Sequence, residues 1–229
     1  MIAAERALHT RASLSGRLHV WEQDGVLAVR ATDPELSFLS AVSGVTAATL
    51  PAAVDLLHAP VWGEAGPALV LPDGLAPASG LVPAGVRPLA VKRLAAEAAT
   101  DPDVVETDEG FLDVLLAGYE VSGAVAALIA AEHGRPEVRR FLLSDDGAPI
   151  AAAAMSVHGA VAVLGGASTT RAHRGKGAQP RLLAHRLRIA TDACCTMAVA
   201  TAGPGSVSAA NLRKAGFRLH LRTAWVKSA

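Results

Sequence analysis

The chain has 229 residues, of which 51% are apolar and only 3% aromatic, and its formal net charge at neutral pH is zero. This length suits one large domain or two small ones, with a core built mainly from Ala, Val and Leu. The charge balance argues against nucleic-acid binding driven by overall charge, and no apolar run reaches the roughly 18–20 residues of a membrane span. Because the start also lacks a basic-then-apolar signal pattern, we expect a soluble protein of the cytoplasm.

The first part of the chain predicts a mixture of helix and strand. A helix-like start is followed by strands over residues 18–21 and 26–31, joined across Asp24 and Gly25, and by a helix over residues 51–58. Residues 66–88 are rich in proline and glycine, which is typical of a loop-rich zone.

The second part predicts a sheet flanked by helices. Strands are expected over residues 104–106, 140–143, 151–157, 160–167 and 196–201, with helices over 111–116, 121–133 and 208–215. His158 and Gly159 predict a tight hairpin turn, since His tolerates a left-handed backbone and Gly prefers it. Gly216 ends the last helix, and Phe217 begins a final strand. The fold class is therefore α/β, with a mixed sheet of the α+β kind.

A basic, glycine-spaced loop follows the strand at 160–167 and runs directly into a helix. Backbone N–H groups at a helix start are unpaired and attract anions. Gly175 and Gly177 let the backbone approach a ligand closely, while Arg174 and Lys176 add positive charge. This segment predicts a site for a phosphorylated ligand.

Three common phosphate or nucleophile motifs do not fit this loop. A P-loop needs a hydroxyl residue after its Gly-Lys pair, but Gly177 stands there. The dinucleotide fingerprint fails because Pro180 occupies its third glycine position. A nucleophile elbow around Ser168 fails because Thr170 replaces its last glycine.

The arrangement that does fit resembles the coenzyme A loop of the GNAT superfamily of N-acyltransferases, whose signature is [Q/R]-x-x-G-x-[G/A]. The segment from Arg174 to Gln179 matches at Arg174 and Gly177 and departs at Gln179. The order of predicted strands and the Gly216–Phe217 helix end are also similar to that family. The resemblance covers roughly residues 100–229.

The resemblance implies two parts of the chain. Residues 96–229 would form the acyltransferase domain with the coenzyme loop. Residues 1–95 have the length of a degenerate copy of the same fold, as in larger members of the superfamily, or of an accessory domain, and they contain no equivalent loop.

The resemblance also implies acyl transfer from acetyl-CoA, or another acyl-CoA, to an amine by direct attack in a ternary complex. The residues expected to bind the coenzyme are Ala167, Ser168, Thr169, Arg174, Gly175, Lys176, Gly177, Ala178, Gln179 and Asn211. A backbone N–H within residues 165–167 would stabilise the thioester oxyanion.

Proton transfer is where the sequence departs from the family. Leu212 occupies the position where many members carry a tyrosine, and the strand at 160–167 contains no acidic residue. We therefore take Tyr119, Glu120 and Ser208 as the candidate catalytic residues, with His158 as a more distant possibility at its turn. No metal is expected, because the adjacent Cys194 and Cys195 alone make no zinc site.

Several alternatives stay open. The acceptor is a small-molecule or peptide amine. The donor could instead be a carrier-protein thioester or an aminoacyl-tRNA, docked on the basic helix with Arg181, Arg186 and Arg188. A non-catalytic coenzyme A binder on the same fold is the other reading, and a homodimer is compatible with the sequence.

Overall fold

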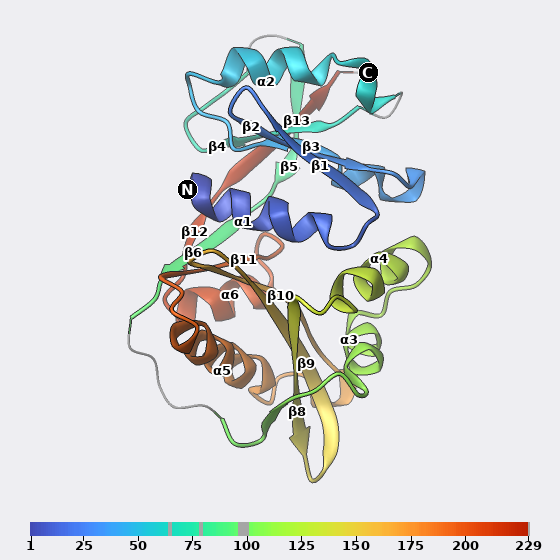
Figure 1. Cartoon of the computed structure of the whole chain (residues 1–229), viewed down its shortest axis with the longest axis vertical. Helices are drawn as coiled ribbons and strands as arrows, with labels where there is room; N and C mark the ends of the chain where they lie inside the picture. Colours follow the sequence, from blue (N-terminus) through green and yellow to red (C-terminus); the bar gives the residue numbers. More distant parts are fainter. Residues whose placement is uncertain (64–65, 78–79, 96–100, 229) are drawn as a thin grey trace.

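The structure is a computed structural model that describes residues 1–63, 66–77, 80–95 and 101–228. Two sheets lie one above the other, and the first helix lies between them (Figure 1). Across the described chain, no helix has the length and apolar character needed to cross a membrane.

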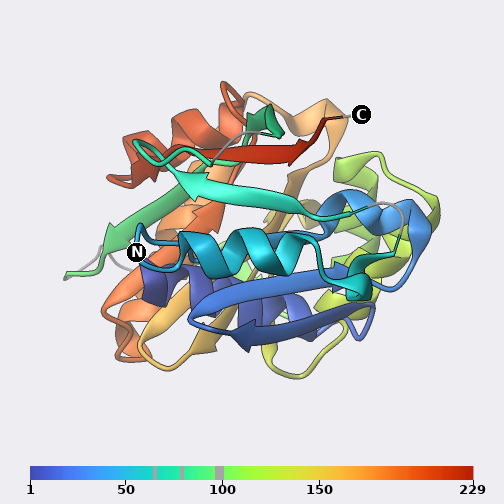
Figure 2. The ribbon, with the colours of Figure 1, turned by 90° about the horizontal axis from the view of Figure 1, so that it is seen from above.

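The upper sheet has six strands in the order β1-β2-β3-β4-β13-β5. Their bounds are β1 Leu18–Gln23, β2 Val26–Ala31, β3 Ala41–Ser43, β4 Ala68–Pro72, β13 Arg222–Lys227 and β5 Leu81–Val86. Helix α2 (Leu50–Leu57) lies across this sheet on the side away from α1 (Ile2–Ser13), as the view from above shows (Figure 2). Two short 3₁₀ helices, Pro34–Leu39 and Pro60–Trp62, complete this part.

The lower sheet has seven strands in the order β12-β6-β11-β10-β9-β8-β7. Their bounds are β12 Arg218–His220, β6 Leu89–Arg93, β11 Met197–Thr201, β10 Val161–Thr169, β9 Ala148–His158, β8 Val138–Asp145 and β7 Val104–Glu106. Only β10 and β11 run parallel; the other neighbours are antiparallel. The expected mixed sheet with flanking helices is confirmed.

Helices cover both faces of the lower sheet. The alternation of strand side chains sends Ala151, Ala153 and Met155 toward α5 (Ala178–Asp192) and α6 (Val207–Lys214). Their neighbours Ala152 and Ala154 pack instead against α3 (Phe111–Tyr119). The remaining helix on that face, α4 (Gly123–His133), follows α3 directly. Small alanine side chains on β9 thus let helices approach from both sides.

The two sheets exchange strands. β6 precedes residue 95 but pairs with β11 and β12 of the lower sheet, whereas β13, at the end of the chain, pairs with β4 and β5 of the upper sheet. Helix α1 also packs on the lower sheet, where Ala4 and Ala7 contact Val161 and Val199. The boundary between residues 95 and 96 stays a prediction, and these elements cross it.

Two local expectations are wrong. The proline-rich zone at 66–88 contains β4 and β5, because its prolines fall at strand ends and at the sheet edge, where a missing N–H is tolerated. The hairpin turn consists of Gly159 and Ala160 rather than His158 and Gly159. His158 pairs with Val161 as the last residue of β9, and Gly159 alone takes the left-handed conformation, with φ of 60°.

Candidate functional site

A cleft opens where β10 and β11 separate. Their parallel pairing ends at Leu164 and Ala200; β11 stops one residue later, whereas β10 continues along β9 to Thr169. We call this the α5 cleft. Its volume is about 460 Å³, and its lining comes from three places. They are β10 with the end of α3 (Gly118, Tyr119, Leu164–Thr169), α5 with its loop (Arg174, Gln179, Leu183, Arg186), and β11 with α6 (Ala200, Thr201, Val207, Ser208, Asn211, Leu212).

The loop at the mouth of this cleft has the backbone that its glycines suggested. Gly175 and Gly177 are both left-handed, with φ of 78° and 85°, and Gly177 is the residue before the first turn of α5. A Cβ at either position would meet no atom within 4 Å. These glycines are therefore needed for their backbone conformation and not for room within the protein itself. Lys176 between them is exposed, as is Arg174.

The residues beside the loop hold it against α3. The guanidinium of Arg174 donates to Gly118 O at 2.8 Å and to a Glu120 carboxylate oxygen at 3.0 Å. The Gln179 side-chain amide donates to Ser168 O and to Thr169 Oγ1, at 2.7 and 3.0 Å. The residue that departs from the family signature thus ties the start of α5 to the end of β10.

Ser168 is turned away from the cleft mouth toward α3. Its hydroxyl is buried and donates to Leu115 O at 2.9 Å. A Cβ on Gly118 would lie 2.4 Å from this hydroxyl, so the close approach of α3 to β10 requires glycine there. The expected role of Ser168 toward a coenzyme rests on its backbone.

β10 carries a bulge at the point where the strands separate. The register with β9 shifts between Gly165 and Ser168, and Gly166 is left-handed with φ of 61°. A Cβ at Gly165 would lie 3.1 Å from the Arg11 guanidinium, and one at Gly166 would lie 2.0 Å from His133 Nε2. The two consecutive glycines therefore face the same side of the sheet, and both are needed for close approach.

A second cleft, of about 820 Å³, opens on that side of the sheet and meets the first at the bulge. We call it the α1 cleft. It is lined by α1, by the end of α4, and by residues of both sheets, including Glu5, Arg11, Glu132, His133 and Arg222. The residues shared by the two clefts are Tyr119, Leu164, Gly165, Gly166 and Thr201. Molecules bound on opposite faces of the sheet would come together at these residues.

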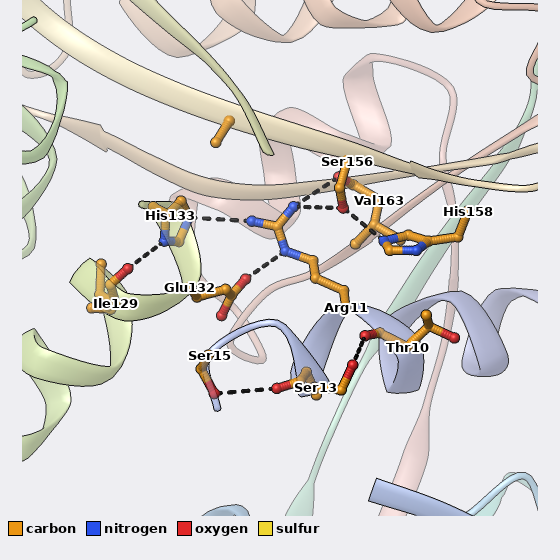
Figure 3. Close-up of polar contacts among 12 residues, drawn as sticks. Thr10, Arg11, Ser13, Ser15, Ile129, Glu132, His133, Ser156, His158 and Val163 are labelled. Carbon is orange, nitrogen blue, oxygen red and sulfur yellow. Dashed lines mark hydrogen bonds and ion pairs between the residues drawn. The ribbon is translucent and has the colours of Figure 1, made fainter. Parts of the chain in front are cut away.

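A buried polar network surrounds Arg11 on the wall of the α1 cleft (Figure 3). Arg11 Nε contacts a Glu132 carboxylate oxygen at 2.5 Å, and Arg11 NH1 donates to Ser156 Oγ at 3.0 Å. Ser156 in turn contacts His158 Nε2 at 2.8 Å. The pKa of His158 lies below its usual range because of burial and the nearby Arg11 charge.

His133 is held as a neutral imidazole. Arg11 can only donate hydrogen bonds, so its NH2 group, 3.2 Å from His133 Nε2, requires that nitrogen to be unprotonated. The proton is then on Nδ1, which donates to Ile129 O at 2.8 Å. Burial lowers the pKa of His133. The negative charge of Glu132 opposes this shift, and the positive charge of Arg11 adds to it.

Tyr119 lies at the junction of the two clefts. Its hydroxyl oxygen accepts a hydrogen bond from the Ala167 backbone N–H at 2.9 Å, which leaves the phenolic proton for another acceptor. Tyr119 as a whole is 36% exposed, but desolvation of its hydroxyl raises its pKa, so the hydroxyl stays protonated near neutral pH. The Ala167 N–H, one of those expected to face a thioester, donates to Tyr119 instead in this structure.

The other predicted residues are spread over the site. Ser208 and Asn211 of α6 line the α5 cleft opposite β10. The adjacent Ser206 caps α6 by accepting from Ala209 N at 3.1 Å. Glu120 lines neither cleft; it follows α3 with φ of 56° and pairs with Arg174. Its catalytic role stays a prediction, as do those of Tyr119 and Ser208.

Sequence reasoning missed Arg11, Glu132 and His133. Arg11 comes from the first helix, and Glu132 and His133 from the last turn of α4. A Glu-His pair at the end of an apolar helix was the available signal. The role of this pair depends on its contacts with Gly166 and Arg11, which are distant in the sequence and which no local pattern connects to it.

The basic helix is not a docking surface formed by three arginines. Arg181 pairs with Asp101 and Asp103, at 2.7 and 2.6 Å, and Arg188 pairs with Asp192 at 2.9 Å. Arg186 is only 3% exposed. The expectation is therefore wrong for Arg186, which is buried, and docking of an acidic partner at Arg181 and Arg188 stays a prediction.

Comparisons with known proteins agree on the fold. No family model and no curated protein matches the sequence. The solved structure of a GCN5-related N-acetyltransferase from Kribbella flavida is similar, with a TM-score of 0.65 and 17% identity over 99% of this chain and 96% of that one. A GNAT-family protein from Novosphingobium aromaticivorans has a TM-score of 0.58 and 19% identity over 96% and 97% of the two chains.

A third similar structure is a GCN5-related N-acetyltransferase from Sphaerobacter thermophilus, with a TM-score of 0.53 and 12% identity, covering 91% of this chain and 75% of that one. The chain has the fold of the GNAT N-acetyltransferases over nearly its whole length. The resemblance inferred from the loop is confirmed at this level, and it extends beyond residues 100–229 into the first part of the chain.

Proposed function

We propose that this protein transfers an acetyl or other small acyl group from a coenzyme A thioester to the amine of a small molecule or peptide. The observation that carries the proposal is the meeting of two clefts at the β10 bulge. One cleft begins at a glycine-spaced helix start suited to a pyrophosphate, and the other opens on the opposite face of the sheet.

The α5 cleft is the proposed donor site. Backbone N–H groups from Gly175 to Gln179 would hold the pyrophosphate, with Lys176 adding charge. The pantetheine arm would run between β10 and α6, past Thr169, Ser208 and Asn211. This route brings the thioester to the bulge, where the α1 cleft begins.

In the reaction, the amine nitrogen attacks the thioester carbonyl carbon, and the carbon–sulfur bond breaks. An alkyl amine with a pKa near 10 costs roughly 4 kcal/mol to deprotonate at pH 7, so a base is needed. We assign this role to Glu132 rather than Glu120, because Glu132 lines the α1 cleft. Within the described chain, only one of its carboxylate oxygens is engaged, by Arg11.

The departing sulfur needs a proton. Tyr119 carries a phenolic proton at the cleft junction, and its raised pKa keeps that proton available at neutral pH. We assign to Tyr119 the role that a tyrosine of helix α6 has in many GNAT members, because this chain has Leu212 at that position and both residues line the α5 cleft. Ser208, across the α5 cleft, would hydrogen-bond the arm of the coenzyme or a water beside it.

The test is product formation from acetyl-CoA and a panel of primary amines. Chromatography with mass detection is preferable to a thiol reagent, because Cys194 is exposed. We expect coenzyme A and an acylated amine in equal amounts, with loss of both in Gly177→Glu.

Gly74→Glu is the matched control. Its φ of 83° is close to the 85° of Gly177, and it too has nothing within 4 Å of a Cβ. Amine-dependent release that survives Gly177→Glu, or no release with any amine, would overturn the proposal.

A further inference from the structure

A buried arginine lies within the α5 cleft, away from the coenzyme loop. Arg186, on the sheet-facing side of α5, is 3% exposed and lines the cleft together with Leu164 and Leu183. Its Nε donates to Leu182 O at 3.2 Å, and its NH1 donates to Ala154 O at 2.9 Å.

Arg186 has no carboxylate partner among the described residues. The two other buried arginines differ: Arg11 contacts Glu132 at 2.5 Å, and Arg222 contacts Glu5 at 3.0 Å. A buried cation without a counter-ion is costly, and burial lowers the pKa of Arg186 to about 10. The guanidinium is still positively charged at neutral pH.

A purely structural role of Arg186 accounts for only some of its hydrogen-bond donors. Ala154 faces Gly165 just before the β10 bulge, so the NH1 bond supports a carbonyl at the register shift. The NH2 group makes no hydrogen bond within the described chain, and the side chain lines the cleft. These donors and the net charge remain for a ligand.

The position of Arg186 indicates which part of the donor it would meet. It lies nine residues after Gly177, which corresponds to about 13 Å along the helix from the proposed pyrophosphate site. Arg186 lines the α5 cleft together with Tyr119 and Leu164, two of the residues that the α5 and α1 clefts share. This is the acyl end of the cleft.

Resting on the proposed function, we infer that the preferred donor is the coenzyme A thioester of a dicarboxylic acid, whose free carboxylate pairs with Arg186. A carboxylate matches a guanidinium in charge and in the spacing of its two oxygens. It would supply the counter-ion that the described residues do not.

Two unreactive coenzyme A thioethers of equal chain length test the inference by calorimetry: S-(2-carboxyethyl)-CoA and S-propyl-CoA. They differ only in a terminal carboxylate against a methyl group. We expect the carboxylate ligand to bind about tenfold more tightly to the unmodified protein. Equal affinities, or tighter binding of S-propyl-CoA, would overturn the inference and leave the proposed function standing.

Variants locate the preference. Arg186→Met should remove it, and Arg186→Gln, which keeps a donor for Ala154 O, should do the same if Met impairs folding. Arg188→Met is the control on the same helix, since Arg188 is exposed and paired with Asp192. A preference that persists in both Arg186 variants places the carboxylate elsewhere. Failure of both ligands to bind at millimolar concentration would overturn the proposed function together with the inference.

Discussion

The two clefts that meet at the β10 bulge are built in different ways. The α5 cleft comes mostly from one stretch of chain, residues 164–186, with further walls from the end of α3, from β11 and from α6. The α1 cleft is assembled from α1, α4, both sheets and the last strand, elements up to 217 residues apart, as in the Arg222–Glu5 pair. A locally built cleft suits a donor that many enzymes share. A cleft assembled from distant segments can change its specificity without disturbing the first.

The largest effect is expected from separating those distant segments. A fragment of residues 96–229 lacks β6, which lies between β11 and β12, and lacks α1 on the same sheet. We expect it to show no cooperative unfolding transition by circular dichroism. Co-expression with residues 1–95 should restore folding. A folded fragment that binds acetyl-CoA like the full chain would show that the α5 cleft is independent of the first part.

At the junction itself, Gly166→Ala should be strongly destabilising. Alanine at this position would be strained by the left-handed backbone, and its Cβ would clash with the ring of His133. Together these two effects should lower the free energy of unfolding by about 3 kcal/mol. Gly147→Ala, also left-handed but in open space, should cost only about 1 kcal/mol. Urea unfolding measures both.

A double variant identifies the source of the difference between these two glycines. In Gly166→Ala with His133→Ala, the clash is absent and only the backbone cost remains. A cost for Gly166→Ala that is unchanged by removal of the ring would contradict the contact between the bulge and α4.

Glu132→Gln should separate the two clefts functionally. Removing the proposed base should lower kcat by roughly 100-fold while the affinity for acetyl-CoA stays the same. Because Arg11 loses its carboxylate partner, the melting temperature must be followed in parallel.

Glu120→Gln is the comparison variant. Its carboxylate pairs with Arg174 beside the α5 cleft, so we expect weaker coenzyme binding with little change in kcat. The reverse pattern would return the base to Glu120.

The smallest effect is a pH dependence of stability that arises on the α1 side. Burial lowers the folded-state pKa of His133, so the unfolded chain takes up protons first as the pH falls below about 6.5. Stability should therefore decrease from pH 7 toward pH 5, by at most about 1.4 kcal/mol per pH unit for one group. His133→Gln should make this slope shallower in urea titrations without removing it, because burial also lowers the pKa values of His158, His185 and His220. His58→Gln, at an exposed position, should leave the slope unchanged.

One cleft is built mostly from a single stretch of chain and the other from distant segments, and this difference explains which parts of the site could be predicted from the sequence. The loop, the start of α5 and the helix end at Gly216 depend on residues that are neighbours in the chain, and the structure has them as expected. Strands β4 and β5 were missed because prolines and glycines surround them: β4 is an inner strand that ends in Pro72, and β5 is an edge strand that contains Pro83. Arg11, Glu132 and His133 could not be assembled, because they lie on α1 and α4, about 120 residues apart in the chain, and meet only through the packing of both helices on β10.

Calorimetric titration with acetyl-CoA and desulfo-coenzyme A tests the central claim most directly. If the α5 cleft holds the donor, both ligands bind with micromolar affinity. Gly177→Glu then weakens binding at least about 100-fold, because it forces a side chain into a left-handed position at the pyrophosphate site, and Gly74→Glu binds like the unmodified protein. No binding at millimolar ligand, or equal losses in the two variants, would contradict the assignment of the α5 cleft to a coenzyme A donor.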